Sequence, residues 1–287
     1  YKIRKSFWAF CKTISKRNDM SFKTASAFCS FVFALPHKEI KIEFQGGEPS
    51  LRMDIIEYIV RKINLRNIYH RKVISYVICT NLISISHYEV SLLKKYHIAV
   101  STSLDGPKKL HELNRPIDDK NSSYELMMAN VFMLRNQKIY PSALVTITKN
   151  NIDCMHEIID EYIKRGFQDI FIRPLNNYGY AFSNESISYS IDNYIEAYID
   201  AVRYIINKNI HDRINIREIW FRIILKKIFS PFNDGFVDMQ NPCALGKMCM
   251  IVTQHGDVYP SDESRMISEM GDSYWKMGNI NNKNCFI

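Results

Sequence analysis

Short apolar segments alternate with amphipathic segments over residues 1–176 of the chain. The apolar segments are rich in Val, Ile, Phe and Thr, and they are nearly continuous in apolar character, which is typical of parallel strands buried on both faces. Strands followed by helices of this length build a parallel sheet or barrel, so the pattern predicts an α/β fold. The five expected strands occupy residues 40–45, 73–80, 99–105, 143–149 and 169–175.

The segments around these strands have the spacing of amphipathic helices. Ser86 and Ser122 are suited to cap the first turns of two of them, and Gly166 is suited to end another. Strands and helices therefore alternate in the order that parallel crossovers require. The expected helices occupy residues 21–35, 51–66, 86–96, 123–137 and 153–165.

The helix at 21–35 has no strand before it in the printed sequence. A parallel crossover joins two strands, and the apolar stretch at residues 1–3 is too short to be one. The sequence also begins with Tyr1 rather than Met. We therefore expect a first strand that lies upstream of the printed chain.

The pattern changes after the fifth strand. Two amphipathic helices are expected at 194–208 and 217–229 with no strand between them, and residues 231–235 then interrupt the chain. A short cysteine-containing segment follows. The sequence therefore predicts three parts, a barrel-like domain, a helical bridge and a small C-terminal module, at residues 1–180, 181–235 and 236–287.

Composition and charge narrow the class of protein. Hydrophobic residues make up 46% of the chain and charged residues 24%, which is ordinary for a globular protein. No apolar run is long enough for a transmembrane helix, and no secretory signal pattern opens the chain. The net charge is +8, but the basic residues are scattered along helices and no aromatic–basic motif accompanies them, which disfavours nucleic-acid binding. Seven irregularly spaced cysteines favour a reducing, cytoplasmic setting over a disulfide framework.

The strand at 40–45 ends in the segment Gly46, Gly47, Glu48 and Pro49. Glycines allow close approach of a ligand to the backbone, and proline can rigidify the entry to a helix. A turn rich in carbonyl groups could bind an ammonium group, and the alternative is a simple strand-to-helix turn. Its position favours a ligand, because α/β proteins bind ligands at the carboxyl ends of their strands.

Polar side chains also mark the other strand ends, and these ends should converge at one rim of the sheet. A network of mutually satisfied loop residues is the alternative to a binding site. Arg115, in the loop after the third strand, could clamp a carboxylate through two hydrogen bonds, although a lone loop arginine is commonly a surface residue. The polar residues at the strand ends are Thr80, Asn81, Ser101, Ser103, Asp105 and Arg173.

Three segments in a fixed order, "FQGGEPSL", "TN" and "STSLDGPKKLHELNRP", closely resemble the radical S-adenosylmethionine (SAM) superfamily. The likeness is greatest to peptide- and protein-modifying members with a SPASM or twitch extension, which include anaerobic sulfatase-maturing enzymes. The segments "IKIEFQGGEP" and "GDVYPSDESRM" are most similar to maturases of the His-Xaa-Ser peptide system.

The resemblance implies a fold and an activity. The fold would be a partial (β/α)6 TIM-like barrel, followed by helices and a truncated SPASM/twitch-like module. The activity would be cleavage of SAM to a 5′-deoxyadenosyl radical, which modifies a ribosomally made peptide or protein. The implied cofactors are SAM and a 4Fe–4S cluster, and the implied partners are the peptide substrate and a reductant such as a flavodoxin or ferredoxin.

The resemblance also implies site residues. The segment Gly46, Gly47, Glu48 and Pro49 would meet the amino group of SAM, Ser103 would lie near its ribose or methionine part, and Arg115 would bind its carboxylate. Asn81 matches the family pattern more weakly as a further SAM contact. Asp262, in "YPSDE", matches an acid that acts as a base near the substrate in sulfatase maturases, and a solvated acid is the alternative.

The chain departs from the family pattern at its cysteines. No Cys-x-x-x-Cys-x-x-Cys triplet occurs, and in the candidate segment "RKSFWAFC" only Cys11 is present, with Arg4 and Trp8 at the two other positions. Cys243 matches the first cysteine of the C-terminal module, whereas Ser261 replaces the second. Cys11 and Cys243 are therefore the candidate metal ligands. Either the chain is a truncated or diverged relative of an active maturase, or it is a non-catalytic protein that binds SAM or a peptide or partners an active maturase.

Overall fold

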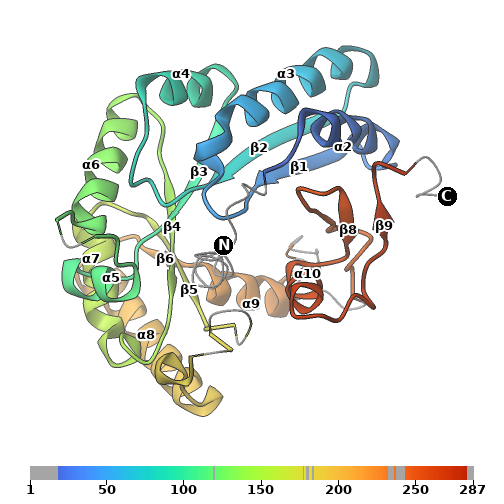
Figure 1. Ribbon diagram of the computed structural model, residues 1–287. Coiled ribbons are helices and arrows are strands. Elements are labelled where there is room, and N and C mark those ends of the chain that lie inside the picture. The colour runs from blue at the N-terminus through green and yellow to red at the C-terminus, as the bar shows by residue number, and fades with distance from the viewer. Residues whose placement is uncertain are drawn as a thin grey trace.

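The computed structural model describes residues 19–282 except 119, 177, 179–180, 183, 232–235 and 237–242. Six parallel strands form one curved sheet in the order β1-β2-β3-β4-β5-β6 (Figure 1). The predicted α/β fold with a parallel sheet is therefore confirmed, and the five predicted strands are present. The strands span Glu39–Phe44 (β1), Val73–Cys79 (β2), Ile98–Ser103 (β3), Ser142–Thr146 (β4), Asp169–Arg173 (β5) and Arg217–Glu218 (β6).

Helices cover the convex face of this sheet in the order of the chain (Figure 1). Ser86 and Ser122 accept hydrogen bonds from backbone N–H groups in the first turns of α4 and α6, as predicted, and Gly166 adopts a φ of 70° after the end of α7. The helices are α2 (Phe22–Ala34), η1 (Pro49–Arg52), α3 (Met53–His70), α4 (His87–Lys95), α5 (Lys108–Asn114), α6 (Ser123–Asn136), η2 (Ile152–Cys154), α7 (Met155–Lys164), η3 (Glu185–Ile187), α8 (Ile191–His211) and α9 (Ile219–Phe229).

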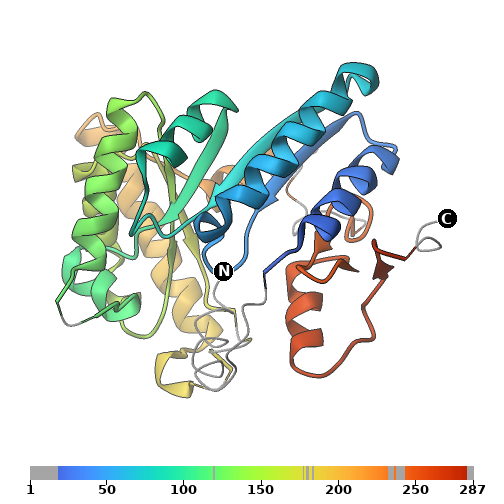
Figure 2. The same ribbon diagram turned by 45° about the horizontal axis from the view of Figure 1, so that its top comes forward.

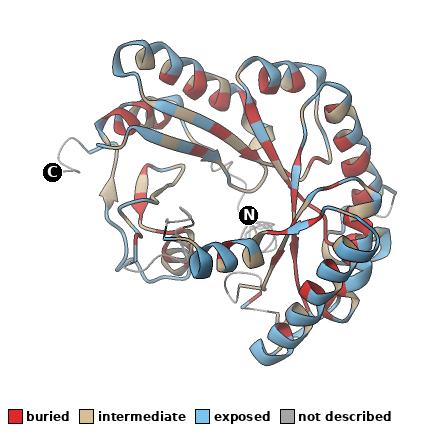
Figure 3. Cartoon of the chain, turned by 180° about the vertical axis from the view of Figure 1, so that it is seen from behind, coloured by how far each residue is buried: buried red, intermediate tan, exposed pale blue. Residues whose placement is uncertain are grey.

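The two faces of the sheet differ in burial, which corrects the expectation that the strands are buried on both faces. In β1, apolar residues alternate with the exposed residues Glu39, Lys41 and Glu43. Tyr76 of β2 is buried and donates a hydrogen bond to Asn64 of α3, so this side of the strands faces the helices. Figure 3 shows the same alternation of buried and exposed positions along the strands. The concave face at β1 is therefore polar, and its period-two pattern is visible in the sequence itself.

Two elements differ from the sequence-based prediction. β6 pairs with β5 through Asp169↔Arg217 and Ile170↔Glu218, where no strand was expected between the helices. It is only two residues long, too short to produce a period-two pattern. α5 occupies part of the segment that was predicted to be a loop. The expected strand upstream of Tyr1 and the candidate ligand Cys11 lie outside the described residues.

A small antiparallel sheet follows the main sheet in the order β7-β8-β9. Together with α10 (Asp262–Glu269) it lies beside α2 at the open side of the large sheet in both views (Figures 1 and 2). Its strands span Ile251–Val252 (β7), Asp257–Tyr259 (β8) and Gly278–Asn279 (β9). The three predicted parts of the chain and their boundaries stay a prediction. Across the described residues, none of the helices is both long and apolar enough to span a bilayer.

Candidate functional site: a polar rim at the carboxyl ends of the strands

The segment after β1 forms a turn that leads directly into η1. Gly46 has a φ of 140°, a backbone conformation that residues with a Cβ rarely adopt. Glu48 is the N-cap of η1 and accepts a hydrogen bond from Ser50 N at 3.2 Å, and Pro49 is the first residue of that helix. Glycine and proline therefore have the backbone roles that the sequence predicts for them.

The Glu48 carboxylate joins this turn to the end of the neighbouring strand. Thr80 donates its hydroxyl to Glu48 Oε1 at 2.6 Å, and the backbone N–H of Asn81 donates to Oε2 at 2.8 Å. The Asn81 side chain instead accepts a hydrogen bond from Ile83 N at 2.9 Å. The structure therefore brings Glu48 and Asn81 together, as predicted, but it does so through the Asn81 backbone.

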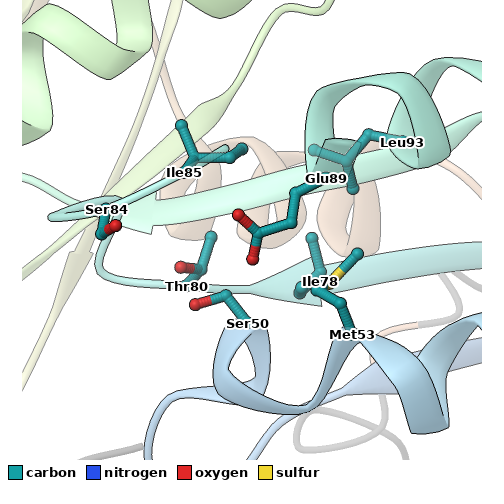
Figure 4. Close-up of a pocket in the computed structure, with 8 residues that line it drawn as sticks. All are labelled: Ser50, Met53, Ile78, Thr80, Ser84, Ile85, Glu89 and Leu93. Atoms are coloured by element: carbon teal, nitrogen blue, oxygen red, sulfur yellow. The ribbon is translucent and has the colours of Figure 1, made fainter. Parts of the chain in front are cut away.

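A small hollow lies beside this connection, between the start of α3, the end of β2 and the start of α4 (Figure 4). It encloses about 230 Å³ of space that is open to solvent. Pockets for drug-sized ligands are larger than this, so we do not assign SAM to it. The sequence gave no signal for the hollow, because its lining comes from separate segments. The lining residues are Ser50, Met53, Ile78, Thr80, Ser84, Ile85, Glu89 and Leu93.

Small polar side chains line the middle of the concave face. Cys79 of β2 is in register with Ser101 of β3, and Ser103 lies next to Leu144 of β4. The Cys79 thiol donates to Glu43 Oε1 at 3.2 Å, and burial together with the Glu43 carboxylate raises the pKa of the thiol. Cys79 is therefore held as a protonated thiol, which is a poor metal ligand. Ser103 is buried, at the predicted position near the strand end.

Arg115 lies against a carboxylate that the chain itself supplies. Its Nε donates to Asp105 Oδ2 at 2.7 Å, and its Nη2 lies 3.5 Å from Oδ1, with side-chain exposures of 16% for Arg115 and 2% for Asp105. The backbone N–H of Thr146 also donates to Asp105 Oδ1, at 3.0 Å. Burial opposes ionisation of Asp105, but the Arg115 guanidinium and His111 outweigh it and keep the pKa of this carboxyl below its usual value. The clamp that the sequence predicts for SAM is thus an internal ion pair here, and a SAM carboxylate would have to share the same guanidinium.

Asp262 lies in the small C-terminal segment, as the first residue of α10. Arg265 donates to its Oδ1 from Nε at 2.9 Å and from Nη2 at 2.7 Å, and the same guanidinium also binds Glu269 at 2.7 Å. Ser261, which stands where the family pattern has a cysteine, is the N-cap of this helix and accepts a hydrogen bond from Ser264 N. Asp262 is therefore an ion-paired residue at a helix start, and its predicted role as a base stays a prediction.

The thiols of the described residues do not form the ligand set of an iron–sulfur cluster. Cys243 is exposed, and Cys29 is buried on α2, where burial raises the pKa of its thiol to about 11. Across residues 19–282, leaving out those that the structure does not describe, no three His, Cys, Asp or Glu side chains are grouped so that they could hold a metal ion. A 4Fe–4S cluster needs several thiolate ligands together, so these residues do not fit one.

No family model matches the chain. It is 27% identical over 270 residues to the cysteine-type anaerobic sulfatase-maturating enzyme of Clostridium novyi, which covers 88% of this chain and 62% of that enzyme. It is also 30% identical over 162 residues to an uncharacterized protein of Methanocaldococcus jannaschii, covering 56% of this chain and 55% of that protein. The chain thus spans less than two thirds of the length of these relatives.

Solved structures share the fold. The structure of anSMEcpe with bound AdoMet and the Kp18Cys peptide has a TM-score of 0.76 at 18% identity and covers 92% of this chain and 70% of that one. The structure of Streptococcus suis SuiB bound to the precursor peptide SuiA has a TM-score of 0.61 at 16% identity and covers 91% of this chain and 56% of that one. The resemblance to radical SAM maturases is therefore confirmed, and so is the TIM-like fold class that it implies.

Proposed function

We propose that this chain binds SAM at the polar rim and acts as a maturase-type protein on a ribosomally made peptide or protein. The observation that carries the proposal is the Glu48 connection, which holds the Gly46–Gly47 turn against the end of β2 through Thr80 and Asn81. A turn fixed in this way presents backbone at the carboxyl end of a strand, where α/β folds bind ligands. The similarity to sulfatase maturases supports SAM as the ligand.

The described residues divide the binding of SAM between them. Backbone carbonyl groups of the Gly46–Gly47 turn would accept hydrogen bonds from the methionine ammonium group, because the glycines allow close approach. Ser103, on the third strand, would contact the ribose or methionine part, and Arg115 would contribute part of its charge to the SAM carboxylate. When bound, SAM supplies an activated adenosyl group. Because the described thiols do not fit the implied cluster, the proposed roles are limited to binding and orienting SAM and peptide.

A second candidate function is a SAM- or peptide-binding protein without a cluster. The observation that favours it is the absence of the Cys-x-x-x-Cys-x-x-Cys triplet from the 287 residues. Both candidates share the rim, and they differ in whether the protein carries iron and sulfide. Anaerobic reconstitution with iron and sulfide, followed by absorbance spectra and iron counting, separates them. A stable cluster supports the maturase, and its absence supports the binding protein.

The shared part of the proposal is tested by calorimetric titration of the protein with SAM. We expect binding that weakens roughly tenfold in Glu48→Gln, because the amide replaces one of two oxygens that accept from Thr80 and Asn81. Glu125→Gln is the matched control, since Glu125 is exposed and pairs with Lys108 on the surface. If the unsubstituted protein binds no SAM with a Kd below about 1 mM, both candidate functions lose their common basis.

A further inference from the structure

The carboxyl-terminal half of the concave face carries two charged side chains with different partners. Glu43 of β1 pairs with Lys41 at 3.0 Å. Arg173, at the end of β5, faces the same side as Thr146, its register partner on β4. Arg173 is half-buried, and in the part of the chain that the structure describes it has no carboxylate partner; its printed contact is the Phe171 ring, 5.2 Å from Cζ. A half-buried cation of this kind is incomplete without an anion.

A second donor without an acceptor lies next to the same ring. The indole nitrogen of Trp220, in the first turn of α9, is buried and makes no hydrogen bond within the described residues. Its ring packs on Phe171 with centroids 5.6 Å apart and on Phe236 at 5.1 Å. Buried indole N–H groups normally find a partner, so this unsatisfied donor is an independent sign of a missing acceptor.

The nearest acid in the chain is already engaged. Glu218 begins α9, and its two carboxylate oxygens accept hydrogen bonds from Ile172 N at 3.2 Å, from Tyr198 Oη at 2.5 Å and from Phe221 N at 2.6 Å. Glu218 therefore satisfies the backbone of β5 and α9 rather than Arg173 or Trp220. The exposed Arg222 lies on the same helix and adds positive charge to this region.

The two donors share one aromatic neighbour, and this arrangement defines the chemistry of a ligand. A planar guanidinium matches a carboxylate with two parallel hydrogen bonds, and the indole N–H can donate to the same group. The rings of Phe171 and Phe236 exclude water around the donors, which strengthens such contacts. The complementary ligand is therefore a carboxylate.

The position of the site separates it from the proposed SAM site. The Gly46–Gly47 turn follows β1, and Arg173 ends β5, so four strand spacings of roughly 4.8 Å place them about 19 Å apart along the sheet. The amino and carboxylate groups of SAM are attached to the same carbon atom. A SAM molecule whose ammonium lies at the turn therefore leaves Arg173 to another molecule.

We propose that Arg173 and Trp220 bind a carboxylate of the peptide substrate, carried by an acidic side chain or by the C-terminus. This inference rests on the proposed function, because it takes the second molecule at the rim to be the peptide. It assigns the β5–α9 side of the rim to the substrate and the β1–β2 side to SAM.

The test uses the full chain with ¹⁵N-labelled arginine and tryptophan side chains, followed by NMR. The probes are N-acetylglutamate N-methylamide for an acidic side chain, N-acetylalanine for a C-terminus, and N-acetylglutamine N-methylamide as the neutral match. We expect at least one acid to shift the Arg173 Nε–H and Trp220 Nε1–H signals together, with a Kd on the order of 1 mM. The acid that shifts them identifies the source of the carboxylate. If neither acid shifts them, or the neutral probe shifts them equally, the proposal fails.

Substitutions assign the signals and locate the effect. Arg173→Gln should abolish the response of Trp220, and Trp220→Phe, which keeps the ring but removes the N–H, should weaken the response of Arg173 several-fold. Arg222→Gln is the matched control, because Arg222 is exposed on the same helix, and it should leave the response unchanged. An equal loss in Arg222→Gln would mean that general positive charge attracts the acid, which overturns the site.

SAM and 5′-methylthioadenosine, which lacks the carboxylate, complete the test. If SAM shifts the Arg173 signal while 5′-methylthioadenosine and both acids do not, the carboxylate belongs to SAM and the assignment to the substrate is wrong. Calorimetry on the same sample tests the proposed function separately. If SAM does not bind but the acids still shift both signals, the proposed function fails while the carboxylate site stands.

Discussion

Two arginines near the carboxyl edge of the sheet, Arg115 and Arg173, differ in what surrounds them. Arg115 binds the buried carboxylate of Asp105, which also accepts from the Thr146 backbone. Arg173 contacts the Phe171 ring and has no carboxylate partner among the described residues. The first arginine completes the fold, and the second has a charge that the described part of the fold leaves uncompensated.

This difference teaches that a motif match locates an arginine but not its partner. The resemblance to radical SAM proteins points to Arg115, since that residue lies in the matching segment. The geometry shows that most of the Arg115 donor capacity is directed to Asp105 within the chain. Substitutions that remove each charge should therefore have opposite signatures, a loss of stability on the Arg115 side and a loss of ligand binding on the Arg173 side.

The largest expected effect is that of Asp105→Asn. The amide would leave the half-buried Arg115 guanidinium without a counter-charge, and breaking one partner of a buried pair costs about 3–5 kcal/mol. The free energy of unfolding in urea measures this loss. Glu125→Gln, which removes one partner of the exposed pair with Lys108, is the control and should change stability by less than about 1 kcal/mol. Equal losses in the two variants would contradict the structural role of Asp105.

The same pair should make stability depend on acid pH. Because the folded-state pKa of Asp105 lies below its ordinary value of 3.8, the stabilisation is fully present above that value and is lost as pH falls through the lower, folded pKa. Urea unfolding of the unsubstituted protein and of Asp105→Asn, compared from pH 6 downward, should therefore converge at low pH. A difference that stays constant below pH 3.8 would show that ionisation of Asp105 does not contribute.

The Glu48 connection should respond with a smaller loss. Thr80→Val removes the hydroxyl that donates to Glu48 at 2.6 Å and leaves a carboxylate oxygen with one donor fewer, which costs about 1–2 kcal/mol. Thr80→Ser keeps the hydroxyl and should retain most of the stability. Thermal unfolding of the two variants, with SAM titration alongside, measures both consequences. A Thr80→Val protein that is as stable as Thr80→Ser would mean that this hydrogen bond does not hold the turn.

The sequence predicted the elements of the sheet better than the partners within the site. Runs of β-branched residues located the five long strands, because burial against helices demands them. The Gly46–Pro49 segment correctly marked a special turn after β1. The contact between Glu48 and Thr80 joins residues 32 positions apart, and no local pattern encodes it. β6 was missed because two residues carry no period, and its pairing depends on the position of β5.

The unsatisfied donor Trp220 shows the same limit from another side. An aromatic residue in an amphipathic helix is ordinarily a packing residue, and nothing in the local sequence indicates that its N–H lacks an acceptor. That property depends on Phe171, Phe236 and the first turn of α9 coming together in space. Sites of this kind emerge only from a residue-by-residue account of donors and acceptors.

The smallest expected effect on stability is that of Arg173→Gln. An arginine without an internal counter-charge contributes only its contact with the Phe171 ring, so its removal should change the free energy of unfolding by no more than about 0.5–1 kcal/mol. Arg115→Gln should cost about 3 kcal/mol or more, because it leaves the Asp105 carboxylate buried and uncompensated. Urea unfolding of both variants under identical conditions measures the contrast directly. If Arg173→Gln loses as much stability as Arg115→Gln, then Arg173 has an internal partner and the two sides of the rim are alike. If its loss stays small while binding of the carboxylate probes disappears, the charge of Arg173 serves a ligand rather than the fold.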